Sequence, residues 1–135
     1  MNILILEDEE VSRQLLEILL TRHGYRSKAV GSVLQAFEHL RKGLYDLILM
    51  DLGLPGLDGI SFTRKLKKYP EFRDIPVIAM TGTPREFMEA TAVRAGCDAF
   101  LEKPVDTDAL LKTISTFESM TVEGQMEQKT DALKK

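Results

Sequence analysis

The stretch Leu47-Ile48-Leu49-Met50-Asp51, which runs into the loop LGLPGLDG at residues 52–59, decides the fold of this chain. Four consecutive large aliphatic side chains are typical of a parallel strand that is covered on both faces of its sheet. The glycines and the proline that follow are turn residues. The sequence therefore predicts a buried strand over Leu47–Met50 that runs into Asp51, then a turn, and then a helix from about Asp58 to Lys68.

Short aliphatic runs on both sides of this strand predict further strands. The five expected strands are Ile3–Leu6, Tyr25–Val30, Leu47–Met50, Val77–Met80 and Ala99–Leu101. The first, third and fourth are apolar throughout, as buried parallel strands are. The second is more polar, which indicates a place at or near an edge of the sheet.

Helical patterns separate these strands. Apolar residues recur at helical spacing at Val11, Leu15, Ile18 and Leu19. Ser32 and Gln35 form a capping box for a second helix that ends near Lys42-Gly43. Later helix starts are expected at Thr83-Pro84, with Glu86 completing a capping box, and at Asp106 or Thr107.

Five strands alternating with five helices predict an α/β fold, a doubly wound five-stranded parallel sheet with helices on both faces. We expect the flavodoxin-like strand order 2-1-3-4-5, because the three most apolar strands are then central. The segment at residues 121–135 is polar and has no clear apolar periodicity. We therefore expect one domain over residues 1–120, followed by a polar tail or a truncated linker over 121–135.

The bulk composition fits one folded domain, since 44% of the 135 residues are hydrophobic. A formal net charge of −3 gives no general attraction to nucleic acid or to anionic membranes. No apolar run approaches the roughly 20 residues that span a bilayer. Cys97 is the single cysteine, and the acidic N-terminus does not resemble a signal peptide. These features favour the cytoplasm.

Reactive and polar side chains follow the strands at their carboxyl ends. Glu7 and Asp8 follow the first strand, Asp51 the third, Thr81 the fourth and Lys103 the fifth. Ligands of open parallel sheets bind at this edge, so we expect these side chains to converge. Neighbouring carboxylates repel one another, and oxygen-only ligands favour Mg2+ or Mn2+ as the ion that relieves the repulsion. An acidic nucleophile, a metal, a cation and a hydroxyl donor are the parts of a phosphoryl-transfer site.

The sequence resembles the receiver domains of two-component response regulators, the CheY-like superfamily. The segments that carry this resemblance are LILED at 4–8, LILMDLGLPGLDG at 47–59, PVIAMTG at 76–82 and AFLEKPV at 99–105. The resemblance covers nearly the whole chain, to about residue 120. It implies that Asp51 accepts a phosphoryl group from a sensor histidine kinase or a phosphotransfer protein.

The resemblance also implies roles for other residues of the site. Asp8 and Asp51 would ligate Mg2+ together with the backbone carbonyl of Gly53, and Glu7 would act largely through water. Thr81 and Lys103 would bind the phosphoryl oxygens. A further implied feature is a cis peptide bond before Pro104.

Two positions depart from the usual pattern of the family. Glu7 stands where Asp is more usual, and Phe100 stands where many members have Tyr. We expect phosphorylation to draw Thr81 toward Asp51 and to move the Phe100 ring from an outward to an inward position. The output would be a changed surface over helix 4, strand 5 and helix 5 that binds an unknown downstream protein.

Two other functions compete with this interpretation. A haloacid-dehalogenase-like phosphohydrolase also uses an Asp nucleophile after a strand, but it needs a second acid two residues later, where this chain has Gly53. A pseudo-receiver would keep the fold as a scaffold without the chemistry, which the intact set of Asp8, Asp51, Thr81 and Lys103 disfavours. We therefore expect a signalling module and no conventional enzyme, although it would partly catalyse its own phosphorylation and dephosphorylation.

Overall fold

The structure, a computed structural model, describes residues 1–53 and 59–119. The strands are β1 (Asn2–Leu6), β2 (Arg26–Val30), β3 (Leu47–Asp51), β4 (Val77–Thr81) and β5 (Ala99–Glu102). The helices between them are α1 (Glu10–Arg22), α2 (Val33–Lys42), α3 (Gly59–Leu66) and α4 (Arg85–Ala95). Residues 107–119 form a further helix. The chain divides into two compact units, 1–104 and 105–135, and the sheet with α1 to α4 belongs to the first.

The strands form one parallel sheet in the order β2-β1-β3-β4-β5, as predicted. Leu6 of β1 lies opposite Met50 of β3, so the next residues along the two strands, Glu7 and Asp51, are level with each other. On the other side, Asp51 lies opposite Met80 of β4. The register therefore brings the polar residues that follow these strands to one edge of the sheet.

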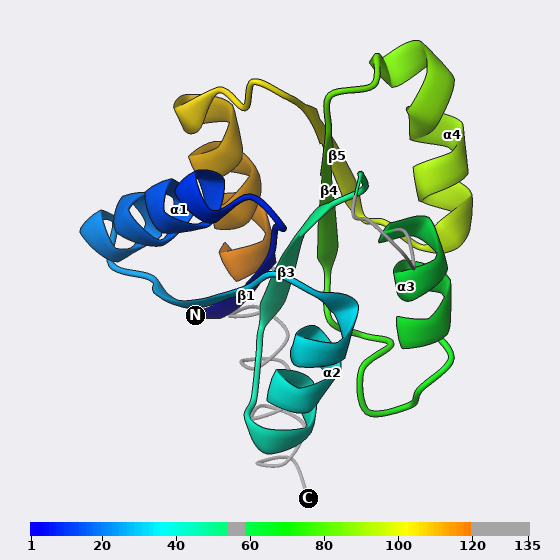
Figure 1. Ribbon diagram of the computed structural model, residues 1–135, viewed down its shortest axis with the longest axis horizontal. Coiled ribbons are helices and arrows are strands. Elements are labelled where there is room, and N and C mark those ends of the chain that lie inside the picture. The colour runs from blue at the N-terminus through cyan, green and yellow to red at the C-terminus, as the bar shows by residue number, and fades with distance from the viewer. Residues whose placement is uncertain (54–58, 120–135) are drawn as a thin grey trace, which may run out of the picture. The chain divides into compact units, whose positions relative to one another are not determined.

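The sheet of the first unit is covered on both faces. Figure 1 shows α1 on one face, with α2, α3 and α4 on the other. Leu4 and Leu6 belong to the cluster of buried side chains shared with α2 to α4, whereas Ile3 and Ile5 point to the opposite face and are also fully buried. This two-sided burial explains why β1 reads as a continuous aliphatic run.

The first helix is where its pattern predicted it, but much of that pattern is exposed. Val11, Leu15 and Ile18 have exposed fractions of 60%, 61% and 50%. Leu20, by contrast, is fully buried. The helical spacing of these residues thus identifies α1 correctly without identifying its buried side.

The N-terminal caps of α2 and α4 test the capping boxes predicted from the sequence. Ser32 caps α2 as predicted, because its side-chain oxygen accepts a hydrogen bond from the backbone N–H of Gln35. The predicted capping box of α4 is wrong, since Pro84 is the N-cap residue and α4 begins at Arg85 without a side-chain bond from its cap. Instead, Glu102 of β5 accepts a 2.6 Å hydrogen bond from the backbone N–H of Arg85. A carboxylate from β5 therefore accepts one of the free N–H groups at the start of α4.

Candidate functional site

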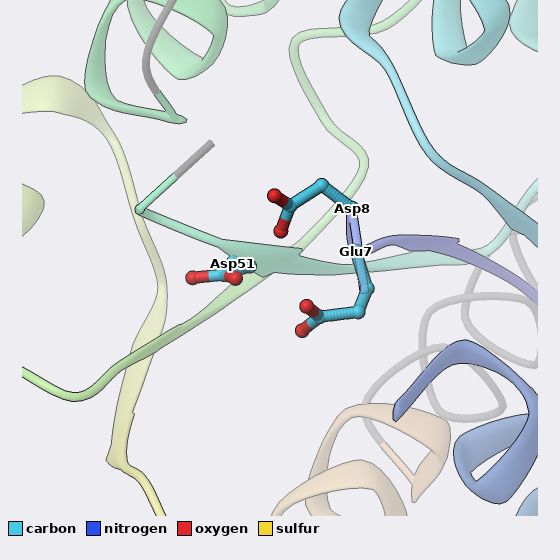
Figure 2. Close-up of side chains that lie close together, drawn as sticks. All are labelled: Glu7, Asp8 and Asp51. Carbon is cyan, nitrogen blue, oxygen red and sulfur yellow. The ribbon is translucent and has the colours of Figure 1, made fainter. Parts of the chain in front are cut away.

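Three carboxylates meet beyond the ends of β1 and β3. One oxygen from each of Glu7, Asp8 and Asp51 lies within 4.8 Å of the others (Figure 2). Glu7 and Asp51 are buried, and Asp8 is exposed. The sheet register explains the arrangement, because Glu7 and Asp51 are level on adjacent strands and Asp8 follows at once.

Lys103 joins the two buried acids of this cluster. Its Nζ lies 2.8 Å from Oε2 of Glu7 and 3.0 Å from Oδ2 of Asp51. The other oxygen of each acid accepts a backbone N–H, from Glu9 for Glu7 and from Gly53 for Asp51. Both buried carboxylates are therefore fixed in direction by one ammonium and one amide group.

Burial and pairing act in opposite directions on these groups. Burial raises the pKa of Glu7 above its usual 4.5, and Asp51 adds repulsion, so that the hydrogen bond from Lys103 does not restore the usual value. Burial alone would lower the pKa of Lys103, but its hydrogen bonds to Glu7 and Asp51 outweigh that effect and raise the pKa. The ammonium is thus held charged, while the Glu7 carboxylate carries a cost of burial that one cation does not remove.

The donor set of this cluster fits a hard divalent cation. Glu7, Asp8 and Asp51 present carboxylate oxygens alone, the ligand type that Mg2+ and Mn2+ prefer. Asp8 is exposed, which leaves the cluster open to solvent on its side. With Lys103 as the cation paired with the two buried acids, three carboxylates leave an excess of negative charge that a divalent ion would neutralise.

Thr81 lies at the same edge of the sheet, at the end of β4. It follows Met80, the partner of Asp51 across the strands, and it is 4% exposed. Its Oγ1 accepts a 3.1 Å hydrogen bond from the N–H of Thr83, and its carbonyl accepts one of 2.8 Å from the N–H of Lys103. Thr81 therefore connects the strand beside Asp51 to the residue that carries the site's ammonium.

Two further residues of the predicted site need separate comment. Gly53 contacts Asp51 through its N–H, and the metal-binding role of its carbonyl stays a prediction. The peptide bond between Lys103 and Pro104 is cis.

Phe100, whose ring we expected to point outward before phosphorylation, is largely buried in this structure. Its exposed fraction is 7%, and the guanidinium carbon of Arg85 lies 5.2 Å from the centre of its ring. Arg85 also donates a 3.0 Å hydrogen bond to the carbonyl of Phe100. The ring is therefore covered by Arg85, and its movement from an outward to an inward position on phosphorylation stays a prediction.

Arg13 of α1 is a residue of this region that the sequence reasoning missed. Its Nη1 donates to the carbonyl oxygens of Glu7 and Asp8, at 3.1 and 2.9 Å. The sequence offered only a weak signal for this residue. Arg13 lies one turn into the helix, and that helix follows two candidate metal ligands. Helical side chains tilt toward the N-terminus of their helix, which brings this guanidinium back over the loop.

Comparison with known proteins places this geometry in context. The family model described as "Response regulator receiver domain" matches residues 3–115. The polar-differentiation response regulator DivK of Brucella ovis is 34% identical over 116 residues, which are 86% of this chain and 94% of that protein.

Solved structures agree with the sequence comparison. The receiver domain of a sensor histidine kinase from Pseudomonas aeruginosa PAO1, with a magnesium ion coordinated in its active-site cleft, is 33% identical with a TM-score of 0.78. The match covers 86% of this chain and 95% of that domain. The signal receiver domain of a signal transduction histidine kinase from Syntrophus aciditrophicus is 30% identical with a TM-score of 0.81, covering 87% and 89% of the two chains.

Proposed function

The chain belongs to the response regulator receiver domain family, and on that premise we propose that Asp51 is the residue that accepts the phosphoryl group. Receiver domains are phosphoacceptor modules of two-component signalling that interact with histidine kinases or phosphotransfer proteins. The observation that carries the assignment is that Asp51 lies both beside two other acids and beside a lysine. It shares the acidic cluster with Glu7 and Asp8, and its Oδ2 lies 3.0 Å from Nζ of Lys103.

Transfer of the phosphoryl group from a phosphohistidine to Asp51 is a displacement at phosphorus. A carboxylate oxygen of Asp51 forms the new P–O bond, the P–N bond breaks, and the imidazole leaves with the electron pair and takes up a proton. Lys103 then pairs with a phosphoryl oxygen as it pairs now with Asp51, and Thr81 turns its hydroxyl to donate to another. The side chains of the domain in this way assist its own phosphorylation and dephosphorylation, although receiver domains are signalling proteins and not conventional enzymes.

We assign the metal site of the domain to the same cluster. Asp8 and Asp51, with the carbonyl of Gly53, would hold Mg2+ or Mn2+, and Glu7 would act through water. A bound ion would supply positive charge for the phosphoryl oxygens. Support comes from the oxygen-only donors of the cluster and from the magnesium ion in the related Pseudomonas domain.

The output of the phosphorylated domain is a surface on α4 and β5 that binds a downstream protein. Phe87 and Val93 of α4 have exposed fractions of 70% and 60%, and apolar side chains of this size on a helix surface suit a protein partner. Arg85, at the start of α4, contacts Phe100 of β5 and so ties this surface to the strand that precedes Lys103.

The setting that we infer for this activity is the cytoplasm, with no direct nucleic-acid contact. Among the residues that the structure describes, no helix has the length and apolar character needed to cross a membrane. The support for the cytoplasm is the composition, with one cysteine, and the net charge of −3 disfavours nucleic acid as a partner.

Labelling with a small phosphodonor tests the acceptor assignment. Acetyl phosphate with Mg2+ should add one phosphoryl group to the intact mass of the wild type, and Asp51→Asn should abolish the addition. Asp74→Asn, which alters an exposed acid in the connection before β4, is the matched control and should label normally. Undiminished labelling of Asp51→Asn would place the acceptor elsewhere, and an unlabelled wild type would favour a pseudo-receiver scaffold.

A further inference from the structure

We propose that Arg13 is a positioning residue for the phosphoacceptor site, and that Gly31 is needed for it to act. The guanidinium of Arg13 holds the loop that carries Glu7 and Asp8, and thereby sets the direction of two metal-binding acids. This inference rests on the proposed function, because it concerns the metal affinity of the same cluster.

The contacts of Arg13 lie on the backbone of the two acids. Nη1 donates to the carbonyl oxygen of Glu7 at 3.1 Å and to that of Asp8 at 2.9 Å. The backbone N–H of Glu7 is also held, by the carbonyl of Val30 at 3.0 Å. Because one nitrogen binds both carbonyls, it fixes the peptide unit between Glu7 and Asp8. The orientation of this unit sets the positions of the Cα and Cβ atoms of both acids.

Arg13 binds backbone carbonyls and not carboxylates, and this difference decides which oxygens remain for a metal ion. Lys103 pairs with one carboxylate oxygen of Glu7 and one of Asp51, so it occupies part of two of the acids that would hold a metal ion. Arg13 binds carbonyl oxygens and leaves the carboxylates of Glu7 and Asp8 to the metal. It acts as an outer group that orients ligands without replacing them, and such groups contribute strongly to metal affinity.

Gly31 provides the space in which the guanidinium lies. A Cβ added at Gly31 would lie 2.7 Å from Nη1 of Arg13 and 3.5 Å from its Cζ. Gly31 has no positive φ, so alanine is compatible with its backbone. The atom that must yield is the end of a flexible side chain, and Gly31→Ala should therefore fold normally while it displaces the guanidinium from the two carbonyls.

The experiment measures Mg2+ binding to the full chain by calorimetry without phosphodonor. Arg13→Met should lower the Mg2+ affinity by about tenfold or more, as loss of an outer-shell partner does. Gly31→Ala should lower it in the same direction. The double variant should lose little beyond Arg13→Met, because both changes remove one clamp and their effects are then not additive.

Kinetics separate positioning from general damage to the fold. Acetyl phosphate labelling of Arg13→Met should need more Mg2+ for half-maximal rate and should approach the wild-type rate at saturating Mg2+. Arg22→Met, which alters an exposed arginine in the last turn of the same helix, should change neither quantity.

The possible failures are distinct. If the wild type binds no Mg2+ and is not labelled at Asp51, the proposed function fails and takes this inference with it. If the wild type binds and labels but Gly31→Ala and folded Arg13→Met keep its Mg2+ affinity, the inference alone is wrong. If Arg13→Met does not fold, Gly31→Ala decides, since an unchanged Mg2+ affinity in that variant overturns the proposal.

Discussion

The ammonium of Lys103 lies 2.8 Å from Oε2 of Glu7, although 96 positions separate the two residues in the chain. Glu7 follows β1 and Lys103 follows β5, strands that are not neighbours in the sheet. The Glu7 side chain is 1% exposed, so its charge has lost nearly all contact with water. A buried carboxylate needs such a partner, and this pair ties the two strands together at the site.

The first prediction is that Glu7 makes the metal-free protein less stable as the pH rises from about 4.5. Because the pKa of folded Glu7 is raised above 4.5, the folded state holds this proton more tightly than the unfolded state. The free energy of unfolding therefore falls as the pH rises through the window between 4.5 and the folded pKa. The pKa of Lys103 is also raised, so the stability that its charge contributes to the fold is lost only above pH 10.5, outside this window.

Glu7→Gln removes this titration and keeps the shape of the side chain. The unfolding free energy of the variant minus that of the wild type should grow with pH across the window and level off above it. Urea unfolding in EDTA at a series of pH values gives this difference. A difference that stays constant with pH would show that Glu7 ionises equally well in both states.

The second prediction concerns Mg2+ and Asp8. An ion that binds only the folded state at 100 times its Kd should stabilise the wild type by about 2.7 kcal/mol. Asp8→Ala should abolish this stabilisation and, without metal, should be at least as stable as the wild type, because one repelling charge is gone. Thermal unfolding with and without Mg2+ measures both effects, with Asp74→Asn as a control. Equal Mg2+ shifts for the wild type and Asp8→Ala would place the ion elsewhere.

The sequence predicts the sheet and the acidic cluster because both depend on local patterns. The aliphatic runs identify the strands, and parallel strands bring Glu7, Asp8 and Asp51, which lie at the strand ends, to one edge. The cap of α4 was not predictable in this way, because Glu102 reaches Arg85 from another strand and overrides the local signal at Thr83. The contacts of Arg13 depend equally on how α1 meets the loop and on the space at Gly31.

The third prediction is that Gly59→Ala destabilises the fold next to the phosphoacceptor. A Cβ at Gly59 would lie 2.9 Å from Cα of Leu52 and 3.0 Å from the carbonyl oxygen of Asp51. These are backbone atoms at the end of β3, so they cannot turn away, and overpacking of this kind costs about 1–3 kcal/mol. Urea unfolding should show the loss. Gly82→Ala, where a Cβ meets nothing within 4 Å, should stay near wild type, and equal stability of the two variants would contradict this account.

The last prediction concerns Arg85 as the link between Phe100 and α4. Arg85 is the first residue of α4, and it binds β5 at three points: the Phe100 ring, the Phe100 carbonyl and the Glu102 carboxylate. Two of these contacts use the guanidinium, and Arg85→Ala removes both while it leaves the backbone bond to Glu102. Phosphorylation at Asp51 should therefore still occur in the variant, but its effect should no longer reach α4.

NMR of the beryllofluoride complex, in which the fluoride group on Asp51 stands in for the phosphoryl group, measures this coupling. In the wild type, amide shifts should extend from the loops around Asp51 to Phe100 and to residues 85–95. In Arg85→Ala they should stay near Asp51. The fold should lose about 0.5–1 kcal/mol from the cation–π contact, in addition to the hydrogen bond to the Phe100 carbonyl and the ion pair with Glu89. Arg85→Lys should restore the coupling in part, because an ammonium can cover the ring but lacks the planar fork of arginine. Arg94→Ala, at an exposed position in the last turn of α4, should behave as wild type. If the α4 shifts of Arg85→Ala match those of the wild type, the signal reaches this helix without Arg85.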